Sequence, residues 1–494
     1  MALPPSKTKL VCTIGPASES PEVMEQMIRA GLNVARLNFS HGDFDSHRRV
    51  IERLRAAARA VGRRITIMAD LPGPKMRIGQ IAGEPIVLSA GDAFELTTED
   101  IVGDPRRASV TFAELPRVVK PGNTLYLNDG VIQLEVLRVE GPRVACRVAA
   151  GGELRSRKGL NLPGIDLGIS AFTGRDHEWL RFAAGAGVDA VSQSFVESSD
   201  DITAVREAAA ALGYHPFLIA KIERSRALSH MDSILEAADG IMIARGDLGV
   251  EIPIEQIAVV QKRLMRQANL AGKPVITATQ MLESMIENRR PTRAEATDVA
   301  NAILDGTDCV MLSGESAMGK YPVDAVAMLA KIAISVEPFR PGHRLRQSLM
   351  SVVQGQTVSP GDLIAISVES ALERMSPAAV IIPTRTGTTA RQIARFRMPV
   401  WITAVSTEEA ICQGLQFSYG VYPVHAPEDP DDWKVFAREW LRSHGIAGHL
   451  VILTQGPSPK HPDDNFRMEI MDLGRVTREG TREQRGLIGG TGQA

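Results

Sequence analysis

The sequence lacks most of the features that mark secreted, membrane-bound or nucleic-acid-binding proteins. Its 494 residues include only four cysteines, scattered without the spacing of a zinc site, so we expect buried free thiols in a reducing compartment. No apolar segment near Met1 has the pattern of a signal peptide, and no apolar run is long enough to span a bilayer. The net charge of −2 argues against nucleic-acid binding through a global positive field. These absences predict a cytoplasmic protein without nucleic-acid or membrane partners.

What is present is an alternation of strand-like and helix-like segments. Hydrophobic residues make up 44% and charged residues 23% of the chain, as in an ordinary globular protein, and the length allows several domains. Apolar residues at helical spacing predict helices over Ser46–Val61 and Ile254–Leu270. Eight strand-like runs, most of them followed by a helical pattern, predict a (β/α)8 or TIM barrel. The runs are Thr8–Gly15, Asn33–Ser40, Arg64–Leu71, Val188–Val196, His215–Glu223, Ala238–Leu248, Lys273–Leu282 and Thr307–Glu315.

The predicted barrel is interrupted after its third strand. Between Lys75 and about Asp166 the sequence changes to short β segments separated by turn signals. The dipeptide Asp129-Gly130 between two alternating runs predicts a hairpin. We therefore expect a small β-barrel inserted in a barrel loop, a position that suits a lid.

A second α/β unit follows the barrel. The run Arg340-Pro341-Gly342 marks a boundary, and strand-like and helical segments alternate after it. The last residues are rich in Gly, Arg and Glu, which predicts a poorly ordered tail. The strands expected in this unit are Ala379–Thr384, Val400–Val405, Gly420–His425, His449–Thr454 and Arg467–Asp472. The predicted domains are the barrel at 1–74 and 167–340, the lid at 75–166, the C-terminal α/β domain at 341–474 and the tail at 475–494.

Three charged residues stand at the ends of two neighbouring predicted strands. Lys221 and Glu223 end one run, and Asp247 lies at the end of the next. Two carboxylates suit Mg²⁺ or Mn²⁺, which takes further oxygen ligands from a phosphorylated or carboxylated substrate. A lysine beside that metal can hold a phosphate or stabilise an enolate. The plainer interpretation, surface ion pairs at strand ends, is weakened because two adjacent strands carry the pattern.

Eight short motifs lie in order along the chain, most of them at the ends of predicted strands. They are Cys12–Pro16, Ala35–Gly42, Lys158–Gly164, Ala220–Glu223, Ala244–Gly249, Ala278–Leu282, Pro291–Glu295 and Met311–Glu315. One such motif would be a weak signal, but together they make the chain resemble the pyruvate kinase family over nearly its whole length. The resemblance implies a (β/α)8 domain, a β lid, a C-terminal α/β effector domain and homotetramers. It also implies a glycolytic enzyme that transfers the phosphoryl group of phosphoenolpyruvate to ADP, giving pyruvate and ATP.

The resemblance implies roles for residues at the metal. Glu223 and Asp247 would hold a divalent cation that bridges the carboxylate and phosphoryl groups of phosphoenolpyruvate. Lys221 would hold the phosphoryl group and stabilise the enolate. Thr279 would take part in protonating the enolate through water, because a hydroxyl is a poor acid by itself. The residues that would complete this relay are Ser313 and Glu315, although capping of the next helix is about as plausible for Ser313.

Further residues are expected to bind the phosphates and the substrate carboxylate. Arg36 and Arg77 would contact phosphates as planar multi-donor groups, although a surface salt bridge is a plausible alternative for Arg77. Gly246 and Asp247 begin a helical turn whose backbone N–H groups suit the substrate carboxylate. The nucleotide phosphates would be contacted by Arg77, His41 and Lys158.

The monovalent-cation pocket of the family is altered in this chain. Asn38, Ser40 and Asp70 match it, but the segment that reads Asp-Thr-Lys-Gly-Pro-Glu in potassium-dependent members is Asp70-Leu71-Pro72-Gly73-Pro74-Lys75 here. At ~4 Å and an effective dielectric of ~20, two unit charges interact by ~4 kcal/mol, so the Lys75 ammonium would repel a bound K⁺ strongly. A fixed ammonium would replace that ion. We predict K⁺-independent activity, as in the lysine-bearing subgroup of the family.

A loop of the C-terminal domain has the composition of a phosphate site. It combines hydroxyl groups, a glycine and the start of a predicted helix, which together suit a phosphate. The family uses this loop for phosphorylated effectors, and a plain turn with a threonine cap is the alternative. The facing loop at 455–461 departs from the family's Gly-rich form, so we expect a sugar monophosphate or a nucleotide monophosphate. The residues of the candidate effector loop are Thr384, Arg385, Thr386, Gly387, Thr388 and Thr389.

Two other functions fit part of the pattern. A metal-dependent barrel lyase acting on pyruvate enolates would use Glu223 and Asp247, but it would not need the lid or the C-terminal domain. A phosphometabolite sensor that had lost catalysis should have lost Lys221, Thr279 or a metal carboxylate, and none of these is missing. An assay of ADP-dependent pyruvate release separates all three functions.

Overall fold

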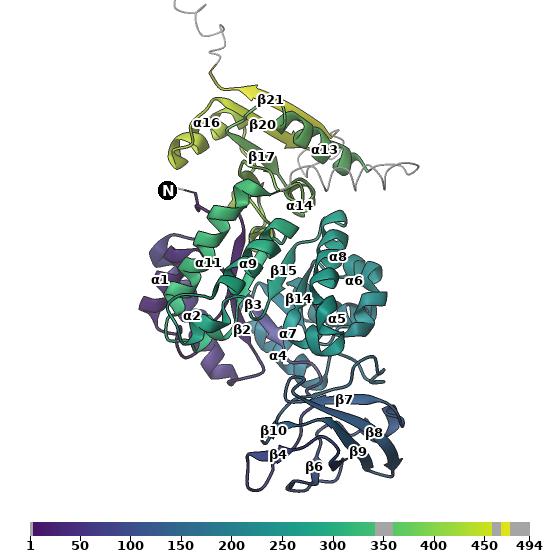
Figure 1. The fold of residues 1–494 in the computed structure, drawn as a ribbon. Helices are drawn as coiled ribbons and strands as arrows, with labels where there is room; N and C mark the ends of the chain where they lie inside the picture. The colour runs from purple at the N-terminus through teal and green to yellow at the C-terminus, as the bar shows by residue number, and fades with distance from the viewer. Residues whose placement is uncertain (1–2, 341–358, 457–465, 475–494) are drawn as a thin grey trace, which may run out of the picture.

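A computed structural model describes residues 3–340, 359–456 and 466–474. The lid and the C-terminal domain lie at opposite ends of a central barrel (Figure 1). The predicted tail at 475–494 and most of the loop predicted to face the effector site fall outside the described residues.

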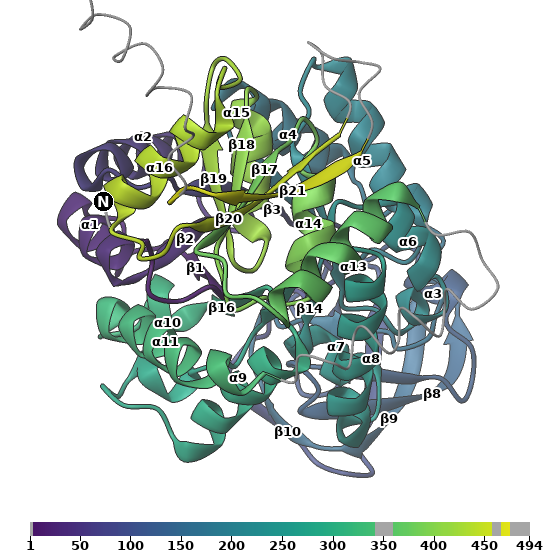
Figure 2. The ribbon, with the colours of Figure 1, turned by 90° about the horizontal axis from the view of Figure 1, so that it is seen from above.

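The predicted (β/α)8 barrel is confirmed. Eight parallel strands close in the order β1-β16-β15-β14-β13-β12-β3-β2, and the helices surround them (Figure 2). The strands are shorter than predicted; the sixth ends at Ala244 because helix α7 begins at the next residue. The strands are β1 (Lys9–Thr13), β2 (Leu32–Asn38), β3 (Thr66–Leu71), β12 (Ala190–Gln193), β13 (Phe217–Ile222), β14 (Gly240–Ala244), β15 (Val275–Ala278) and β16 (Cys309–Leu312).

The helices around the barrel begin with clear capping signals. Asp43 caps α2 and Thr292 caps α9, and each forms a reciprocal capping box with the third helical residue. The helices are α1 (Pro21–Ala30), α2 (Phe44–Val61), α4 (Gly174–Gly185), α5 (Ser199–Ala211), α6 (Met231–Ala237), α7 (Arg245–Glu251), α8 (Ile257–Leu270), α9 (Arg293–Asp305), α10 (Gly314–Ala317) and α11 (Pro322–Val336).

The inside of the barrel is a packed core closed at one end by the C-terminal domain. Val11, Met68 and Met242 pack in this core together with other apolar residues of the strands. Phe417 of the C-terminal domain joins the same cluster and stacks on Phe217 at a ring-centroid distance of 5.1 Å. The four cysteines are buried and free, as predicted: Cys12, Cys146, Cys309 and Cys412. The amino ends of the strands are therefore sealed, and the carboxyl ends face the lid.

The inserted domain is the small β-barrel that the sequence predicted, because residues 76–79 bridge the two edges of its main sheet: the Ile78 N–H donates to Lys158 O at 2.9 Å and the Gly79 N–H donates to Ser109 O at 2.8 Å. Across residues 75–166, all of which are described, six strands form a sheet in the order β11-β7-β8-β9-β5-β6, and β10 pairs only with β4. The predicted hairpin at Asp129-Gly130 is confirmed by antiparallel pairing of β7 and β8. The strands are β4 (Ile86–Leu88), β5 (Ala93–Thr97), β6 (Arg107–Ser109), β7 (Thr124–Leu127), β8 (Ile132–Glu140), β9 (Arg143–Ala150), β10 (Gly152–Leu154) and β11 (Leu160–Asn161).

The C-terminal domain is an α/β sheet with the five predicted strands. Their order is β19-β18-β17-β20-β21, and only the edge strand β21 is antiparallel. The strands are β17 (Ala379–Pro383), β18 (Ile402–Ser406), β19 (Val421–His425), β20 (Leu450–Gln455) and β21 (Arg467–Asp472). The helices are α13 (Pro360–Leu372), α14 (Thr388–Ala394), α15 (Glu409–Gly414) and α16 (Trp433–His444).

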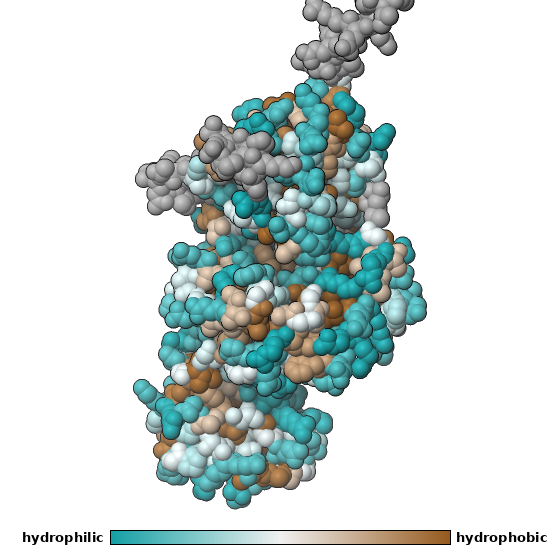
Figure 3. All heavy atoms as spheres, turned by 180° about the vertical axis from the view of Figure 1, so that it is seen from behind, coloured by the Kyte–Doolittle hydropathy of each residue, from teal (hydrophilic) through white to brown (hydrophobic). Residues whose placement is uncertain are grey.

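The surface carries apolar groups only in separated patches on the face shown in Figure 3, where hydrophilic residues predominate. Within the described ranges, no helix combines the length and the apolar character needed to cross a membrane.

Candidate active site at the mouth of the barrel

The predicted site residues converge at the carboxyl ends of the barrel strands. Arg36 lies in β2, Asp70 in the neighbouring β3 and Lys221 in β13, while Asp247 and Thr279 follow β14 and β15 directly. Because all eight strands are parallel, these ends open on the same side, toward the lid (Figure 1). This is the end of a (β/α)8 barrel that carries catalytic residues in known enzymes of this fold.

Lys221 lies at the centre of this group. Its ammonium donates to the Ser194 hydroxyl at 2.6 Å and pairs with Asp70 Oδ1 at 3.4 Å and Glu223 Oε2 at 3.3 Å. Burial favours the neutral amine, but the carboxylates of Asp70 and Glu223 outweigh it and raise the pKa of Lys221. The side chain is only 11% exposed, so Lys221 is a fixed, charged cation at the mouth of the barrel.

One oxygen of the predicted metal ligand Glu223 has no hydrogen-bond donor. Glu223 Oε1 accepts the Phe195 N–H at 2.7 Å, but the buried Oε2 has only the ion pair with Lys221 and no hydrogen-bond donor. Burial raises the pKa of Glu223 to about 7 against the opposing charge of Lys221, and the Asp247 carboxylate adds to the rise. The Asp247 side chain is exposed to solvent at the mouth, but protein atoms surround it closely enough for desolvation to raise its pKa too.

A divalent cation fits this donor set. It would relieve the repulsion between the two carboxylates and complete the coordination of Glu223 Oε2, which is otherwise costly to bury unpaired. Within the described residues there is no cluster of three or more His, Cys, Asp or Glu side chains that could hold a metal. A cation held by Glu223 and Asp247 therefore keeps positions for substrate and water oxygens, as Mg²⁺ sites in phosphoryl-transfer enzymes do.

Arg36 is tied to Asp70. Its guanidinium donates to Asp70 Oδ2 from both Nε, at 3.0 Å, and Nη2, and to the Thr13 hydroxyl at 2.9 Å. Burial alone would raise the pKa of Asp70, but Lys221 and Arg36 outweigh it and lower that pKa. Asp70 is thus a buried anion that holds two cations at the mouth of the barrel.

Thr279 has a strained backbone, which the sequence analysis did not anticipate. Its φ of 68° lies in the left-handed region, where a β-branched residue is an outlier. Three hydrogen bonds hold it: the hydroxyl donates to Ala278 O at 2.7 Å and accepts the Gly246 N–H at 2.8 Å, and Arg245 Nη2 donates to Thr279 O at 2.7 Å. The Gly246 N–H, predicted to bind the substrate carboxylate, is therefore engaged by the Thr279 hydroxyl.

The predicted proton relay at the eighth strand is not supported by the contacts of Glu315. This buried carboxylate accepts the Leu282 N–H at 3.0 Å and the Ser313 N–H at 2.7 Å, so it fixes two loops. Ser313 is the residue before α10, but its side chain makes no capping hydrogen bond. The helix-cap alternative for Ser313 is therefore wrong, and the relay role of its hydroxyl stays a prediction.

The residues predicted to bind nucleotide phosphates gather where the lid joins the barrel. Arg77 forms an antiparallel backbone bridge with Gly159, which links the two segments that join the lid to the barrel, and Lys158 directly precedes Gly159. The Arg77 side chain donates from Nη1 to Arg157 O at 2.8 Å. Burial and the nearby cations, among them Arg77, lower the pKa of His41, so this imidazole is neutral at pH 7. Arg175 at the start of α4, which no sequence motif singled out, lies close enough to act on Lys75 by its charge.

Lys75 occupies the predicted monovalent-cation pocket. Its ammonium donates to Ser40 O at 3.3 Å, and the Asn38 side chain accepts the Ser40 N–H at 3.1 Å. Burial, with the cations Arg77 and Arg175, lowers the pKa of Lys75 to about 8, while Asp70 opposes that shift. The ammonium thus binds the backbone of Ser40, one of the three residues that match the family's monovalent-cation pocket.

Comparison with known proteins agrees with this site. The profile of the family described as "Pyruvate kinase, barrel domain" matches residues 5–326, and that of "Pyruvate kinase, alpha/beta domain" matches 362–466. A pyruvate kinase of Thermococcus litoralis is 50% identical over 92% of this chain and 96% of its own length. The chain belongs to the pyruvate kinase family. These matches cover the lid and the C-terminal domain, which a barrel lyase would not need, and the matched relatives are enzymes.

Other members support the same assignment. A pyruvate kinase of Geobacillus stearothermophilus is 42% identical, covering 91% of this chain and 77% of the relative. The crystal structure of a pyruvate kinase from Cryptosporidium parvum has a TM-score of 0.88 and 35% identity, covering 95% of this chain and 96% of that one. The three-domain fold is thus that of a pyruvate kinase.

The candidate effector loop of this pyruvate kinase family member is pre-organised. Gly387 adopts a left-handed φ of 76° and begins α14, and its N–H donates to the Thr384 hydroxyl at 2.9 Å. The hydroxyls of Thr386 and Thr388 lie 2.9 Å apart, and Arg391 Nη2 donates to Thr386 O at 2.8 Å. The predicted threonine cap of α14 is absent, because Gly387 stands at that position without a side-chain hydrogen bond.

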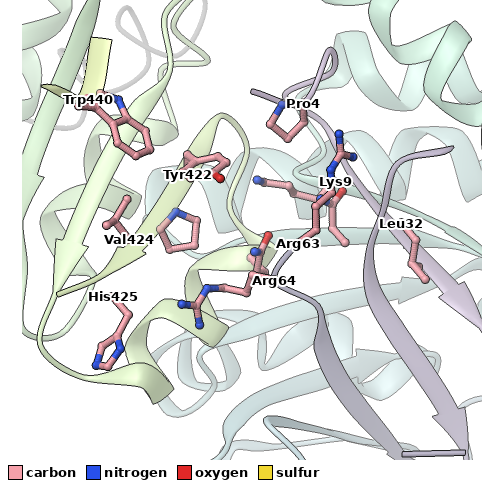
Figure 4. A pocket seen from close by; sticks show the side chains of 12 residues that line it. Pro4, Lys9, Leu32, Arg63, Arg64, Tyr422, Val424, His425 and Trp440 are labelled. Carbon is pink, nitrogen blue, oxygen red and sulfur yellow. The ribbon is translucent and has the colours of Figure 1, made fainter. Parts of the chain in front are cut away.

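A separate cavity lies at the opposite end of the barrel. It has a volume of about 280 Å³ and is lined from both domains, with Lys9 and Arg64 facing Tyr422 and Trp440 (Figure 4). Lys9 is buried and donates to Val421 O at 2.7 Å, and this burial lowers the pKa of Lys9 to about 8. None of the mouth residues lines this cavity, so it is not where the family's chemistry occurs.

Proposed function

We propose that this chain transfers the phosphoryl group of phosphoenolpyruvate to ADP, with Mg²⁺ or Mn²⁺ held by Glu223 and Asp247. One observation carries the metal assignment: Glu223 Oε2 is buried beside Lys221 without a hydrogen-bond donor, and both carboxylates have raised pKa values. When bound, the cation supplies Lewis-acid stabilisation of the charge on the phosphoryl oxygens and on the enolate oxygen.

The protein groups would position the substrate and balance its charge. The Lys221 ammonium is held by Ser194 and two carboxylates, so it is pre-organised to face the migrating phosphoryl group at no reorganisation cost. Arg36 retains donors beyond its bonds to Asp70 and Thr13, and these suit a phosphate oxygen. After phosphoryl transfer, the enolate needs a proton on carbon, and the Thr279 hydroxyl orders the water that delivers it.

The lid would carry the nucleotide phosphates onto this centre. His41, Arg77 and Lys158 lie at the junction of lid and barrel, and Arg175 adds a fourth candidate for contacting phosphates there. We propose that the lid comprises residues 75–166, as the sequence predicts. Closure would exclude water from the transfer, which strengthens each electrostatic contact.

K⁺-independence follows from Lys75. Its ammonium already donates to Ser40 O, and a second monovalent cation there would face its repulsion. We expect full activity in tetramethylammonium salts, and a steep K⁺ requirement would contradict this.

The C-terminal domain would regulate the enzyme through a phosphate ester. Residues 384–389 offer hydroxyls and a glycine-started helix to a sugar or nucleotide monophosphate. A screen in which no phosphate ester alters substrate cooperativity would remove this proposal.

Assembly and location stay predictions. Membership of the family implies a homotetramer. The exposed apolar side chains of Ile254, just before α8, and Val259, within α8, would suit a contact between subunits. Light scattering at assay concentration tests it. We also propose that the protein is cytoplasmic. The boundary between the barrel and the C-terminal domain is proposed to lie between residues 340 and 341.

The decisive experiment is an assay of ADP-dependent pyruvate release from phosphoenolpyruvate. We expect activity that disappears when the divalent metal is removed and is unchanged when K⁺ is omitted. A crystal grown with Mn²⁺ and oxalate, an enolate mimic, should show the metal bound to Glu223 and Asp247. Absence of metal density at these carboxylates would overturn the proposed metal site.

A further inference from the structure

A fully buried arginine, Arg224, lies directly behind the proposed metal site. Arg224 follows Glu223 in sequence and is only 2% exposed. Its guanidinium donates to Glu251 Oε1 at 2.8 Å and to Glu197 Oε1 at 3.0 Å. Burying an arginine is unfavourable unless its donors are satisfied, so a side chain held in this way has a defined position.

The same guanidinium binds the return hinge of the lid. Arg224 Nη2 donates to Ile165 O at 2.9 Å and Leu162 O at 3.3 Å, where the chain passes from the lid back to the barrel. The next two residues hold the same hinge. The Ser225 hydroxyl accepts the Gly164 N–H at 3.2 Å, and Arg226 pairs with Asp166 at 2.9 Å.

Glu251 connects this arginine to the second metal carboxylate. It is the last residue of α7, one helical turn after Asp247. Its Oε2 accepts the Ser225 N–H at 3.2 Å, while its Oε1 accepts from Arg224. The far end of α7 is thereby fixed to the loop that carries Glu223, so one guanidinium joins the backbones of both carboxylates and the lid hinge.

The lid also contacts the metal site from the front. Phe195, whose N–H donates to Glu223 Oε1, packs its side chain against the apolar core of the lid. The hairpin of the lid places Gly130 against Val250 of α7, and the Asp129 carboxylate acts on Asp247. A divalent cation would offset the repulsion between these two carboxylates, so metal binding and lid closure favour each other.

We propose that Arg224, through Glu251 and the hinge carbonyls, is a positioning residue that couples the lid hinge to the two metal-binding carboxylates. The inference rests on the metal site of the proposed function. Lysine cannot replace Arg224 here, because an ammonium lacks the planar fork that reaches two carboxylates and two carbonyls together.

The test is Mn²⁺ binding to the full-length chain without substrates, followed by electron paramagnetic resonance. Arg224→Met and Arg224→Lys should each weaken Mn²⁺ binding by about 10- to 100-fold, the usual range for residues that orient metal ligands. Mn²⁺ should slow amide hydrogen exchange at Gly164 and Ile165 in the wild type but not in Arg224→Met.

Arg55 supplies a matched control at the other end of the barrel. It also binds two carbonyls and a carboxylate, donating to Ile65 O at 3.0 Å, Gly187 O at 2.9 Å and Asp189 at 2.8 Å. Arg55→Met should lower thermal stability and leave Mn²⁺ affinity unchanged. Equal losses of Mn²⁺ affinity in Arg55→Met and Arg224→Met would overturn the coupling, because a general loss of stability would then explain both.

A second variant keeps the test valid if Arg224→Met does not fold. Arg224→Met/Glu251→Met removes both partners and leaves Glu197 with Arg226, so no buried charge is left alone. If this folded variant binds Mn²⁺ as tightly as the wild type, the proposed coupling is overturned while the metal site itself stands. A wild-type chain that binds no Mn²⁺ at the mouth would overturn the metal site and the coupling together.

Discussion

The two ends of the barrel both carry buried charges, and each end leaves a buried polar atom without a hydrogen-bond partner, but that atom is a donor at one end and an acceptor at the other. At the end sealed by the C-terminal domain, Arg397 pairs with Asp308 and donates to Asn269 and Gly306 at 2.6 Å. At the mouth, Glu223 Oε2 lacks a hydrogen-bond donor and Thr279 holds a strained backbone. Both ends also hold a residue in the left-handed region, Arg397 with a φ of 56° and Thr279 with a φ of 68°. At the sealed end the atom without a partner is Nε of Arg397, part of a cation that joins two domains, while at the mouth it is a carboxylate oxygen, which can bind a metal cation.

The difference also appears in the direction of the pKa shifts. Burial raises the pKa of Glu223 and of Asp247, so both carboxylates resist ionisation while no cation lies between them. Asp70, held by two cations, has a lowered pKa only two strands away from Glu223. At the mouth, the carboxylates of Glu223 and Asp247 therefore repel each other, and a divalent cation between them would relieve the repulsion. Substitutions of single residues can test this difference between the two ends.

The largest loss of activity is expected for Lys221→Met. It removes the ammonium that faces the transferring phosphoryl group, and the loss of one pre-organised electrostatic group typically costs about 10²- to 10³-fold in kcat. Pyruvate release at saturating substrate measures it, with circular dichroism as a check on folding. A folded variant that keeps kcat within threefold of the wild type would exclude Lys221 from the chemistry.

Glu223→Gln should abolish measurable Mn²⁺ binding in the substrate-free protein, since an amide is a weaker ligand than a carboxylate. It should also change how metal-free stability depends on pH. Because the folded pKa of about 7 lies above the ordinary value of 4.5, the wild-type carboxyl contributes stability below pH 4.5 that is lost as the pH rises through about 7. Thermal melts in chelator from pH 4 to 8 should show this decline in the wild type and less of it in Glu223→Gln.

Lys75→Glu should make activity depend on K⁺ by roughly tenfold or more, because the substitution changes the local charge by two units. Rates in tetramethylammonium and potassium salts measure this change. The wild type supplies an internal comparison: the pKa of Lys75 is lowered to about 8, so the ammonium is present at pH 7 and is lost above pH 8. K⁺ stimulation of the wild type should be absent at pH 7 and emerge at pH 9, and equal K⁺ response at both pH values would argue against Lys75 as the replacement ion.

The smallest effect on kcat is expected at the sealed end. Arg397→Met should leave kcat within about twofold, yet breaking a buried ion pair costs about 3–5 kcal/mol of stability. The onset of thermal unfolding should fall while pyruvate release stays near the wild-type rate. A loss of kcat comparable to that of Lys221→Met would erase the distinction between the two ends.

The barrel strands and the carboxylate pair could be predicted because they depend on local pattern. Apolar runs with helical segments between them specify a (β/α)8 order, and parallel strands bring Glu223 and Asp247 to the same end whatever their separation in sequence. The hairpin at Asp129-Gly130 follows from turn chemistry in the same way. The pairing of the lid strands could not be predicted, since short strands with similar patterns permit several orders.

Partner choice and backbone strain were missed for a common reason. Arg36 bonds to Asp70, 34 positions away, and Arg224 to Leu162, 62 positions away, and no local pattern specifies such pairs. The left-handed backbone of Thr279 is imposed by hydrogen bonds from Arg245 and Gly246, which lie on a different strand end.

By itself, the sequence determined the fold class, the family and the chemical groups at the mouth, because these depend on periodicity and on motifs of a few consecutive residues. The tertiary structure alone decided which of those groups remain short of partners. The packing decides this, because Glu223 Oε2 is enclosed by protein groups that do not donate a hydrogen bond to it. Lys221 comes from the same strand, but Phe195 and the other apolar groups come from segments distant in sequence, so no local pattern specifies them.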